Sequence, residues 1–149
     1  MPCAASPTAV LSTVSSDSHT WNLIFLELLL TETGYHVHNL GACVPDELLI
    51  GTCHDRRPDL LVLSSVNGHG AIDGARVIRS LRAAPALAAL PAVIGGKLGT
   101  DGDNGVPARR RRLTEAGFDA VFEGASAVVN FQTFARDVRD AALIPGGVR

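Results

Sequence analysis

The chain has 149 residues, of which 46% are hydrophobic, and its formal net charge at pH 7 is −2. This length and apolar content suit a compact domain with a substantial core and argue against a disordered chain. The small net charge predicts no broad attraction to nucleic acid or to an anionic membrane surface. We expect a single domain over residues 1–149, with its core at about 8–143 and with loose ends in the first several residues and in the final "IPGGVR".

The three cysteines, Cys3, Cys43 and Cys53, are odd in number and have no CxxC spacing. They therefore indicate neither a disulfide framework nor a cysteine-rich zinc site. The sequence starts without a basic leader and a long apolar segment, and "NLIFLELLL" is short and contains Glu27, so we expect neither secretion nor a membrane span. A reducing, cytoplasmic location is the expectation.

Short apolar or β-branched runs alternate along the chain with longer segments of helical character. The expected strands are residues 8–14, 35–40, 59–65, 91–95 and 119–122. The expected helices are residues 21–33, a segment that begins at "VPDELL", and residues 72–82, 106–116 and 127–143. Runs such as "DLLVLSSV" are continuously apolar, as parallel strands covered on both faces are. The pattern predicts a doubly wound, flavodoxin-like (Rossmann-like) α/β fold with a five-stranded parallel sheet and flanking helices.

Two expected helices carry recognisable end signals. Gly34 directly follows the first helix, where glycine commonly adopts the left-handed conformation of a C-cap. Pro45 suits the first turn of the second helix, and Asp46 and Glu47 favour the positive end of its dipole. These signals fix where the two helices lie between the strands.

The polar and glycine-rich segments come where expected strands end. "DSH" follows the first strand, "SSVNGHG" ends the third, and "GGKLGTDGDNG" follows the fourth. In open α/β sheets, ligands bind beyond the carboxyl ends of the strands. We therefore expect these segments to meet at one edge of the sheet and to form the site.

Asp17 and His19 are two positions apart in the loop after the first expected strand. A carboxylate that accepts the proton of one imidazole nitrogen fixes the tautomer and makes the other nitrogen a better metal ligand. The pair could therefore bind a metal that a cofactor supplies, since a zinc ion held by protein alone needs about three or four ligands. The alternative is that Asp17 caps the next helix and His19 is an ordinary loop residue.

Ser64, Ser65, Gly95 and Gly96 lie at the ends of the third and fourth expected strands. A serine in an apolar strand needs a hydrogen-bond partner, which is either the protein itself or a heteroaromatic ligand. Paired glycines either make a tight turn or let a bulky ligand approach the backbone. Both alternatives stay open on these residues alone.

Other motifs are weaker. The glycines of "GHGAIDG" miss the GxGxxG dinucleotide spacing by one residue. His36 and His38 would project from one face of a strand and could bind a metal, although exposed polar positions explain them equally simply. The "RRRR" run at 109–112 predicts a solvated helix face, with a partner-binding surface as the alternative.

Taken together, "DSHTWN", "LSSVNGHGAIDG" and "VIGGKLG" resemble the cobalamin (B12)-binding domain family, and among its members most closely the small subunits of glutamate (methylaspartate) mutases. The resemblance runs from about Val10 to the final helix. The family is marked by Asp-x-His-x-x-Gly, Ser-x-Leu and Gly-Gly. This combination is far more specific than any one of its parts.

The resemblance implies that His19 is the lower axial ligand of cobalt and that Asp17 is its hydrogen-bonded partner. It also implies that the dimethylbenzimidazole base leaves cobalt, so that the nucleotide tail enters a deep pocket beside the sheet, near Ser64. The cofactor-binding residues expected on this basis are Asp17, Ser18, His19, Thr20, Asn22, Ser64, Val66, Gly68, Gly95 and Gly96. Apart from the cobalt ligand, no catalytic residue is expected in this chain.

This chain departs from the family pattern at two positions, with Asn22 at the motif glycine and Val66 at the motif leucine. Asn22 adds a side chain where the tail should enter, so it either hydrogen-bonds the nucleotide loop or reshapes binding. The neighbouring Trp21 could pack on the corrin or tail, or in the core.

The resemblance implies the cofactor-binding subunit of an isomerase that depends on adenosylcobalamin and rearranges a carbon skeleton, as in the conversion of glutamate to 3-methylaspartate. A larger, barrel-type catalytic subunit would bind the small amino-acid substrate, and this chain alone would be inactive. Two alternatives are a corrinoid carrier for methyl transfer and a cofactor-free, flavodoxin-like regulatory or interaction domain. A corrinoid that co-purifies would exclude the second of these.

Overall fold

The computed structural model describes residues 6–144, so Cys3 and nearly all of the expected loose ends lie outside the described residues. Its centre is a five-stranded, all-parallel sheet with the strand order β2-β1-β3-β4-β5. The strands are β1 (Thr8–Ser12), β2 (His36–Asn39), β3 (Leu60–Ser65), β4 (Ala92–Gly96) and β5 (Ala120–Phe122). This arrangement confirms the flavodoxin-like fold class, and each strand lies within two residues of its expected bounds.

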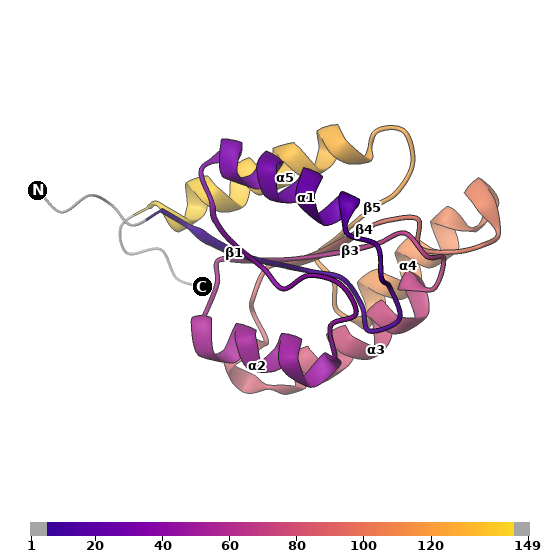
Figure 1. The fold of residues 1–149 in the computed structure, drawn as a ribbon, viewed down its shortest axis with the longest axis horizontal. Helices are drawn as coiled ribbons and strands as arrows, with labels where there is room; N and C mark the ends of the chain where they lie inside the picture. The colour runs from indigo at the N-terminus through magenta and orange to yellow at the C-terminus, as the bar shows by residue number, and fades with distance from the viewer. Residues whose placement is uncertain (1–5, 145–149) are drawn as a thin grey trace, which may run out of the picture.

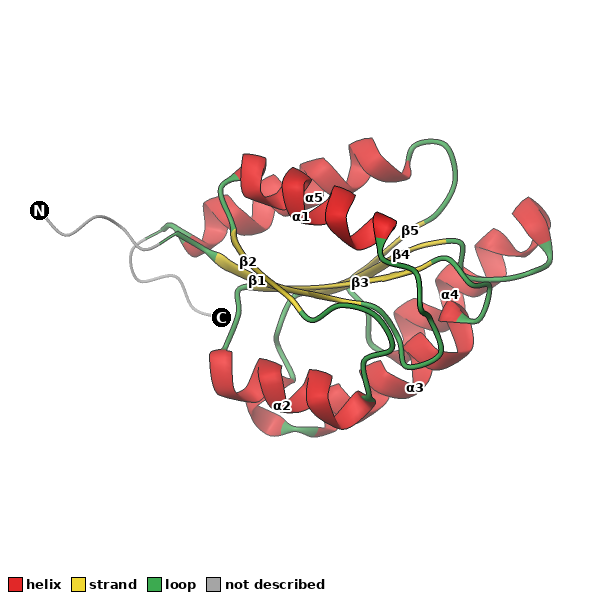
Figure 2. Cartoon of the chain, in the orientation of Figure 1, coloured by secondary structure: helices red, strands yellow, loops and turns green. Residues whose placement is uncertain are grey.

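Helices cover both faces of the sheet (Figures 1 and 2). One layer contains α1 (Trp21–Thr33) and α5 (Ala127–Ala142), and the other contains α2 (Asp46–Arg56), α3 (Gly70–Ala83) and α4 (Val106–Ala116). Two short 3₁₀ helices, η1 (Pro85–Leu87) and η2 (Gly102–Gly105), lie in the connections. Within residues 6–144, none of the helices is long and apolar enough to cross a membrane.

β3 shows why the sheet needs both layers. Its six residues are all buried, and successive side chains point to opposite faces. Leu61 and Leu63 belong to the core beneath α2, α3 and α4, whereas Leu60 and Val62 belong to the core beneath α1 and α5. The continuously apolar run therefore supplies two separate cores, as expected for a central parallel strand.

Most helix ends follow the expected signals. Gly34 is the C-cap of α1, with φ at 110°, and its N–H group donates to the carbonyl of Leu30. Asp46 and Glu47 lie in the first turn of α2, but Pro45 lies one position before that turn as the cap residue, because its ψ of 146° is extended. β1 ends at Ser12 rather than at residue 14, since the chain turns where the Asp17 N–H donates to the Val14 carbonyl.

The strand register places three loops at one edge of the sheet. Ser12 pairs with Leu63, and Ser65 pairs with Gly96. The loop after β1 therefore emerges beside the ends of β3 and β4. The polar residues meet at this edge, as the alternation of strands and helices predicts.

Candidate functional site

The carboxylate of Asp17 joins two segments that are far apart in the sequence. Its Oδ1 accepts hydrogen bonds from the backbone N–H of His19 at 2.9 Å and from the His19 ring at 2.7 Å. Its Oδ2 accepts from the Ser65 hydroxyl at 2.9 Å and from the Val66 N–H at 2.8 Å. Asp17 thus fixes the loop after β1 to the end of β3.

The same contacts control the charge of Asp17, which is fully buried. Burial by itself would raise the pKa of the Asp17 carboxyl group. The hydrogen bonds donated by the backbone N–H groups of His19 and Val66 and by the His19 and Ser65 side chains outweigh burial and lower the pKa to about 2. Asp17 is therefore ionised at neutral pH and can only accept hydrogen bonds.

An ionised Asp17 determines what His19 can do. The carboxylate holds the proton of His19 on Nδ1, which leaves the lone pair of the ring on Nε2. The His19 side chain is 57% exposed, and Nδ1 is the ring nitrogen that contacts Asp17. Asp17 does not cap α1, because Thr20 occupies the N-cap and α1 has no side-chain cap there. The helix-cap interpretation is therefore wrong, and the pair has the geometry of an oriented metal-binding histidine.

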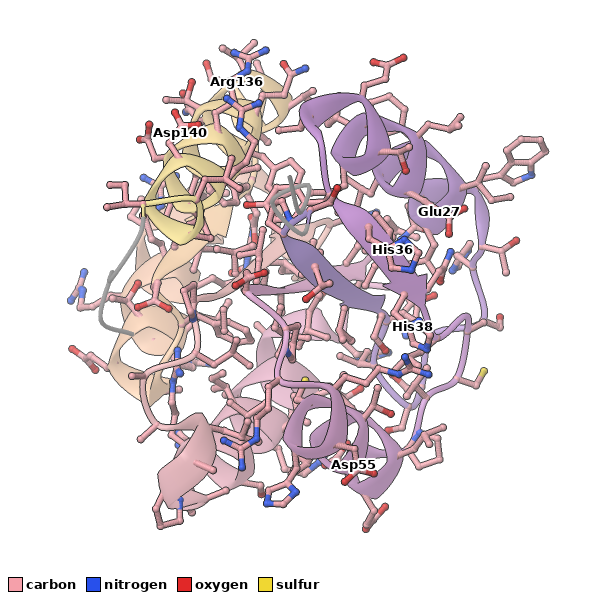
Figure 3. The ribbon with its side chains drawn as sticks, turned by 90° about the vertical axis from the view of Figure 1, so that its left-hand side faces the viewer. Glu27, His36, His38, Asp55, Arg136 and Asp140 are labelled. Carbon is pink, nitrogen blue, oxygen red and sulfur yellow. The ribbon has the colours of Figure 1, made fainter. Side chains whose placement is uncertain are left out.

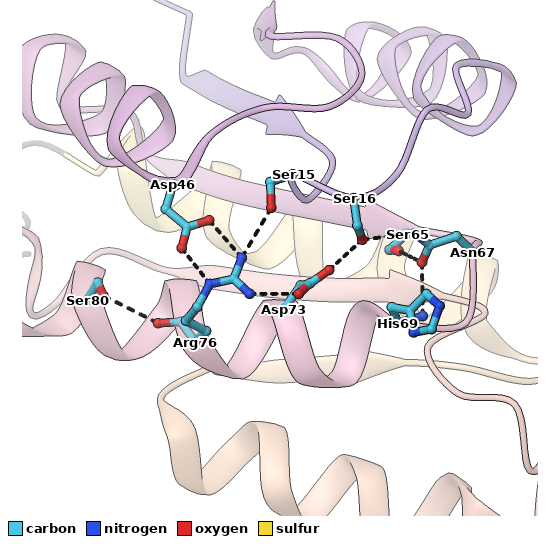
Figure 4. A network of polar contacts seen from close by, with 9 residues as sticks. All are labelled: Ser15, Ser16, Asp46, Ser65, Asn67, His69, Asp73, Arg76 and Ser80. Carbon is cyan, nitrogen blue, oxygen red and sulfur yellow. Dashed lines mark hydrogen bonds and ion pairs between the residues drawn. The ribbon is translucent and has the colours of Figure 1, made fainter.

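Further polar contacts hold this loop from the side of α3 (Figure 4). Asn67 Nδ2 donates to the Ser16 hydroxyl at 3.0 Å, and Asn67 Oδ1 lies 3.1 Å from the Ser65 hydroxyl. Ser16 in turn donates to Asp73 of α3. The loop that carries His19 is thus fixed on two sides, by β3 and by α3.

Arg76 extends the network from α3 to α2. Its guanidinium group contacts Asp73 at 2.7 Å and Asp46 at 2.8 Å, and it also lies 3.3 Å from the Ser15 hydroxyl (Figure 4). These contacts raise the pKa of Arg76, first through the hydrogen bonds to Asp46 and Asp73. The start of α2, the middle of α3 and the loop after β1 are therefore held as one unit.

Beside the His19 loop, a cavity of about 170 Å³ opens between α1, α5 and the carboxyl ends of β3 and β4. This volume is several times the roughly 30 Å³ that one water molecule occupies in the liquid. Its wall is mainly apolar and includes Phe25, Val93, Phe122, Val128 and Phe131. The rings of Phe122 and Phe131 meet edge to face, with centroids 5.7 Å apart. Such a wall suits a flat heteroaromatic group.

Asn22 and Ser64 contribute the only polar side chains among the residues that line this cavity. Asn22 Nδ2 donates to Ser64 Oγ at 2.8 Å. Asn22 Oδ1 is buried and has no hydrogen-bond partner in the described part of the chain. The residue at the motif-glycine position therefore lines the cavity and interacts with the expected base-contacting serine.

The backbone requires both glycines of β4. A Cβ atom on Gly95 would lie 2.8 Å from the Phe122 carbonyl oxygen, and one on Gly96 would lie 2.2 Å from the Ser65 carbonyl oxygen. Gly96 also has a φ of 115°, which side chains rarely tolerate. Both residues also line the cavity. A backbone conformation that requires glycine is therefore compatible with close approach of a ligand to the same backbone.

We expect Gly96→Ala to lower the free energy of unfolding by about 3 kcal/mol or more, because it combines backbone strain with a steric clash. Gly102→Ala is the matched control, since Gly102 also has a positive φ of 67° but no atom lies within 4 Å of the point that its Cβ would occupy. The control should lose only about 1 kcal/mol. Urea denaturation of the three proteins measures the difference, and equal losses for the two variants would contradict the clash.

The structure places the ten sequence-predicted site residues in three groups. Those that line the cavity are Asn22, Ser64, Val66, Gly95 and Gly96. Those in the loop between β1 and α1 are Asp17, Ser18, His19 and Thr20. Gly68 lies apart from the cavity, where its N–H donates to the Lys97 carbonyl at 3.2 Å and its φ is 87°. Gly68 therefore allows the chain to turn between β3 and α3.

Sequence reasoning missed several residues of the site. Ser65 donates to Asp17, and the sequence did not indicate which of the two adjacent serines would do so. Phe25, Phe122 and Phe131 form much of the cavity wall, and no local pattern distinguishes them from core residues. Trp21 is 82% exposed, so the expectation that it could pack in the core is wrong.

His36 and His38 lie on the edge strand β2 (Figure 3), and neither lines the cavity. The pKa of His38 is lowered by burial and by the nearby charges of Arg56 and His36. Within residues 6–144, no group of three or more His, Cys, Asp or Glu side chains is placed to hold a metal ion. The metal-binding alternative for this histidine pair therefore has no support from its surroundings.

The arginine run has two roles. Arg109 is 8% exposed and bonds Glu123 through two nitrogens, at 3.0 Å and 2.7 Å. Arg110, Arg111 and Arg112 are exposed on α4. The expected solvated face is thus correct for the last three arginines and wrong for the first, which ties α4 to the end of β5.

An open parallel sheet with an oriented histidine and an apolar cavity at its carboxyl edge defines a flavodoxin-like ligand-binding domain. Comparison with protein families identifies the family of this domain. The family model "B12 binding domain" matches residues 7–132, and the chain belongs to this family.

Similar proteins agree with this assignment. The glutamate mutase sigma subunit of Halobacterium salinarum is 36% identical over 130 residues, which cover 85% of each chain. A cobalamin-binding protein from Desulfitobacterium hafniense aligns with a TM-score of 0.68 at 22% identity, covering 87% of this chain and 59% of that one. The monomethylamine corrinoid protein of Methanosarcina barkeri aligns with a TM-score of 0.65 at 18% identity, covering 92% of this chain and 57% of that one. The chain thus spans less than two thirds of either solved structure, and both support the fold alone.

Proposed function

We propose that this chain binds cobalamin in the base-off/His-on form and is the cofactor-binding subunit of an adenosylcobalamin-dependent mutase of the glutamate/3-methylaspartate type. The observation that carries the proposal is the buried Asp17 carboxylate, which orients His19 in the loop that leads into α1, the helix whose first turn lines the apolar cavity. The similarity to glutamate mutase sigma subunits supports the adenosyl form and the isomerase class.

The described residues fit this cofactor. His19 would ligate cobalt through Nε2, because Nδ1 is engaged by Asp17. The nucleotide tail would enter the cavity, where Ser64 faces the base and Gly95 and Gly96 leave the backbone open to close approach. The chemistry that adenosylcobalamin supplies when bound is homolysis of its cobalt–carbon bond. The residues of this chain would bind, orient and shield the lower side of the corrin.

A second, larger subunit of the barrel type is part of the proposal. The residues that line the cavity include no charged side chain that could hold an amino-acid carboxylate, so the small amino-acid substrate would bind on the partner. Next to the site, α1 exposes Trp21, Phe25 and Leu28, which are 82%, 50% and 61% exposed. Contiguous exposed apolar side chains commonly mark a protein interface. The cytoplasmic location stays a prediction.

A corrinoid carrier for methyl transfer is the second candidate. The monomethylamine corrinoid protein shares the fold, and the same histidine loop would serve a carrier equally well. Mutase activity after mixing with a barrel-type partner subunit would favour the first candidate. Methylation of the bound corrinoid by a methyltransferase would favour the second.

The decisive experiment is an anaerobic EPR spectrum of cob(II)alamin bound to the full chain, prepared with natural or with ¹⁵N-labelled histidine. Axial ligation by His19 should change the superhyperfine lines from triplets to doublets on labelling, because ¹⁴N has spin one and ¹⁵N has spin one half. Protein labelled at every residue except histidine is the matched control and should keep triplets. Triplets in both samples would show that the tail base still holds cobalt, and absence of a protein-bound signal would overturn the proposal.

A further inference from the structure

The polar pair inside the cavity has hydrogen-bonding capacity that the protein itself does not use. Asn22 Oδ1 is a buried acceptor without a partner in residues 6–144. Ser64 Oγ is the acceptor of the bond from Asn22, so the hydroxyl hydrogen of Ser64 remains to be donated. An acceptor and a donor thus lie side by side at the wall of an otherwise apolar cavity.

Buried polar atoms without a partner are rare, because each costs free energy that a hydrogen bond would recover. The two groups also lie on rigid elements, since Asn22 is in the first turn of α1 and Ser64 is in β3, paired with Gly95. A fixed acceptor and a fixed donor in an apolar wall can select a planar base whose edge carries the complementary donor and acceptor. A glycine at position 22 would provide neither the acceptor nor the bond to Ser64.

We propose that Asn22 makes the cavity selective for a nucleotide base that carries an amino group beside a ring nitrogen, as an aminopurine such as adenine does. This inference rests on the proposed function and specifies which lower base the corrinoid carries. The amino group would donate to Asn22 Oδ1, and the ring nitrogen would accept from the Ser64 hydroxyl. Dimethylbenzimidazole off cobalt has a ring nitrogen for Ser64 but no donor for Asn22, so the buried acceptor would stay unpaired.

The expected preference is about tenfold or more in dissociation constant, since an unpaired buried acceptor costs roughly as much as one good hydrogen bond. The adenine-base and purine-base corrinoids give the most direct comparison. They differ only in the amino group, so the ratio of their dissociation constants measures its contribution to binding. Cobalamin and tail-free cobinamide complete the set. Trp21, the only tryptophan of the chain, is 82% exposed beside the His19 loop and provides a fluorescence signal for titration.

The experiment titrates the full chain and its Asn22→Gly variant with the four corrinoids. We expect the wild-type chain to bind the adenine-base form at least tenfold more tightly than the purine-base form, and the ratio to fall to about one in Asn22→Gly. Asn22→Ala provides a second test if the glycine variant folds poorly. Asn130→Ala changes an exposed asparagine of α5 outside the cavity lining and should keep the wild-type ratio.

Equal affinity of the wild-type chain for the adenine-base and purine-base corrinoids would overturn the selectivity. So would a ratio that survives in both Asn22 variants. In either case, tighter binding of tailed corrinoids than of cobinamide would leave the proposed function intact. If none of the four corrinoids bound, both the selectivity and the proposed function would be wrong.

Discussion

Asp17→Asn is expected to lower the free energy of unfolding by about 3 kcal/mol at pH 7, because four donors converge on the buried carboxylate. An asparagine has only one acceptor oxygen, and its NH₂ group would face the Ser65 hydroxyl and the Val66 N–H or the two His19 donors. At least one buried donor would lose its partner. Urea denaturation monitored by circular dichroism measures the loss.

The effect of Asp17→Asn should depend on pH in a defined direction. The carboxyl pKa is about 2 in the folded chain and 3.8 in the reference state, so ionisation stabilises the fold by about 2 kcal/mol above pH 5. This contribution is lost as the pH falls through the folded-state pKa. The difference in stability between wild type and variant should therefore shrink by about 2 kcal/mol between pH 5 and pH 2, while other carboxyl groups titrate equally in both proteins.

Asp55→Asn is the matched control, because the Asp55 side chain is 84% exposed on α2. It should change stability by less than about 0.5 kcal/mol at either pH. A difference between wild type and Asp17→Asn that stays constant from pH 5 to pH 2 would show that the Asp17 carboxylate does not have its lowered pKa.

His19→Ala should have the largest effect on cofactor binding and a small effect on stability. Loss of the proposed cobalt ligand is expected to weaken cobalamin binding at least as much as loss of a residue that orients a metal ligand, which costs about 10- to 100-fold. The side chain is 57% exposed, so stability should fall by only about 1 kcal/mol, the contribution of its hydrogen bond to Asp17. Absorbance titration with aquocobalamin measures the affinity, and denaturation measures the stability.

His69→Ala is the matched control for His19→Ala. His69 is an exposed histidine at the start of α3, at the same edge of the sheet, and its backbone N–H rather than its ring contacts Asn67. This variant should keep both the affinity and the histidine-dependent EPR pattern. Wild-type affinity in His19→Ala would reject the ligand role of His19, whereas Asp17→Asn should lose both affinity and stability.

The sequence was sufficient to predict the order and type of the strands and α-helices, although not the two 3₁₀ helices. Strongly apolar strands such as β3 and helix stops such as Gly34 are local signals, and both lie where they were expected. The edge at which the loops meet also followed, because parallel strands place their carboxyl ends together. α3 begins at Gly70, two residues before its expected start, since the turn at Gly68 is too short to be read from hydrophobic periodicity.

The partners within the site were harder to predict than its location. The contact between Asp17 and Ser65 joins residues 48 positions apart, and the register of β1 and β3 determines which of two adjacent serines faces the loop. The bond between Asn22 and Ser64 depends on how α1 lies over the sheet. Neither is a property of a local sequence window, so motif spacing identified His19, its partner Asp17 and Ser64, but not the contacts of Asp17 with Ser65 or of Ser64 with Asn22.

The length of chain between Asp17 and its partners also sets an order of events during synthesis. Ser65 and Val66 follow Asp17 by 48 and 49 residues, and β3 must dock on β1 before its donors reach the carboxylate. At a translation rate of about 5–20 residues per second, the nascent chain carries His19 for a few seconds before those donors are made. During that interval the Asp17 carboxylate lacks two of its four donors, and the cavity beside the histidine loop has not formed. Under the proposed function, cofactor loading would therefore follow completion of the central strands.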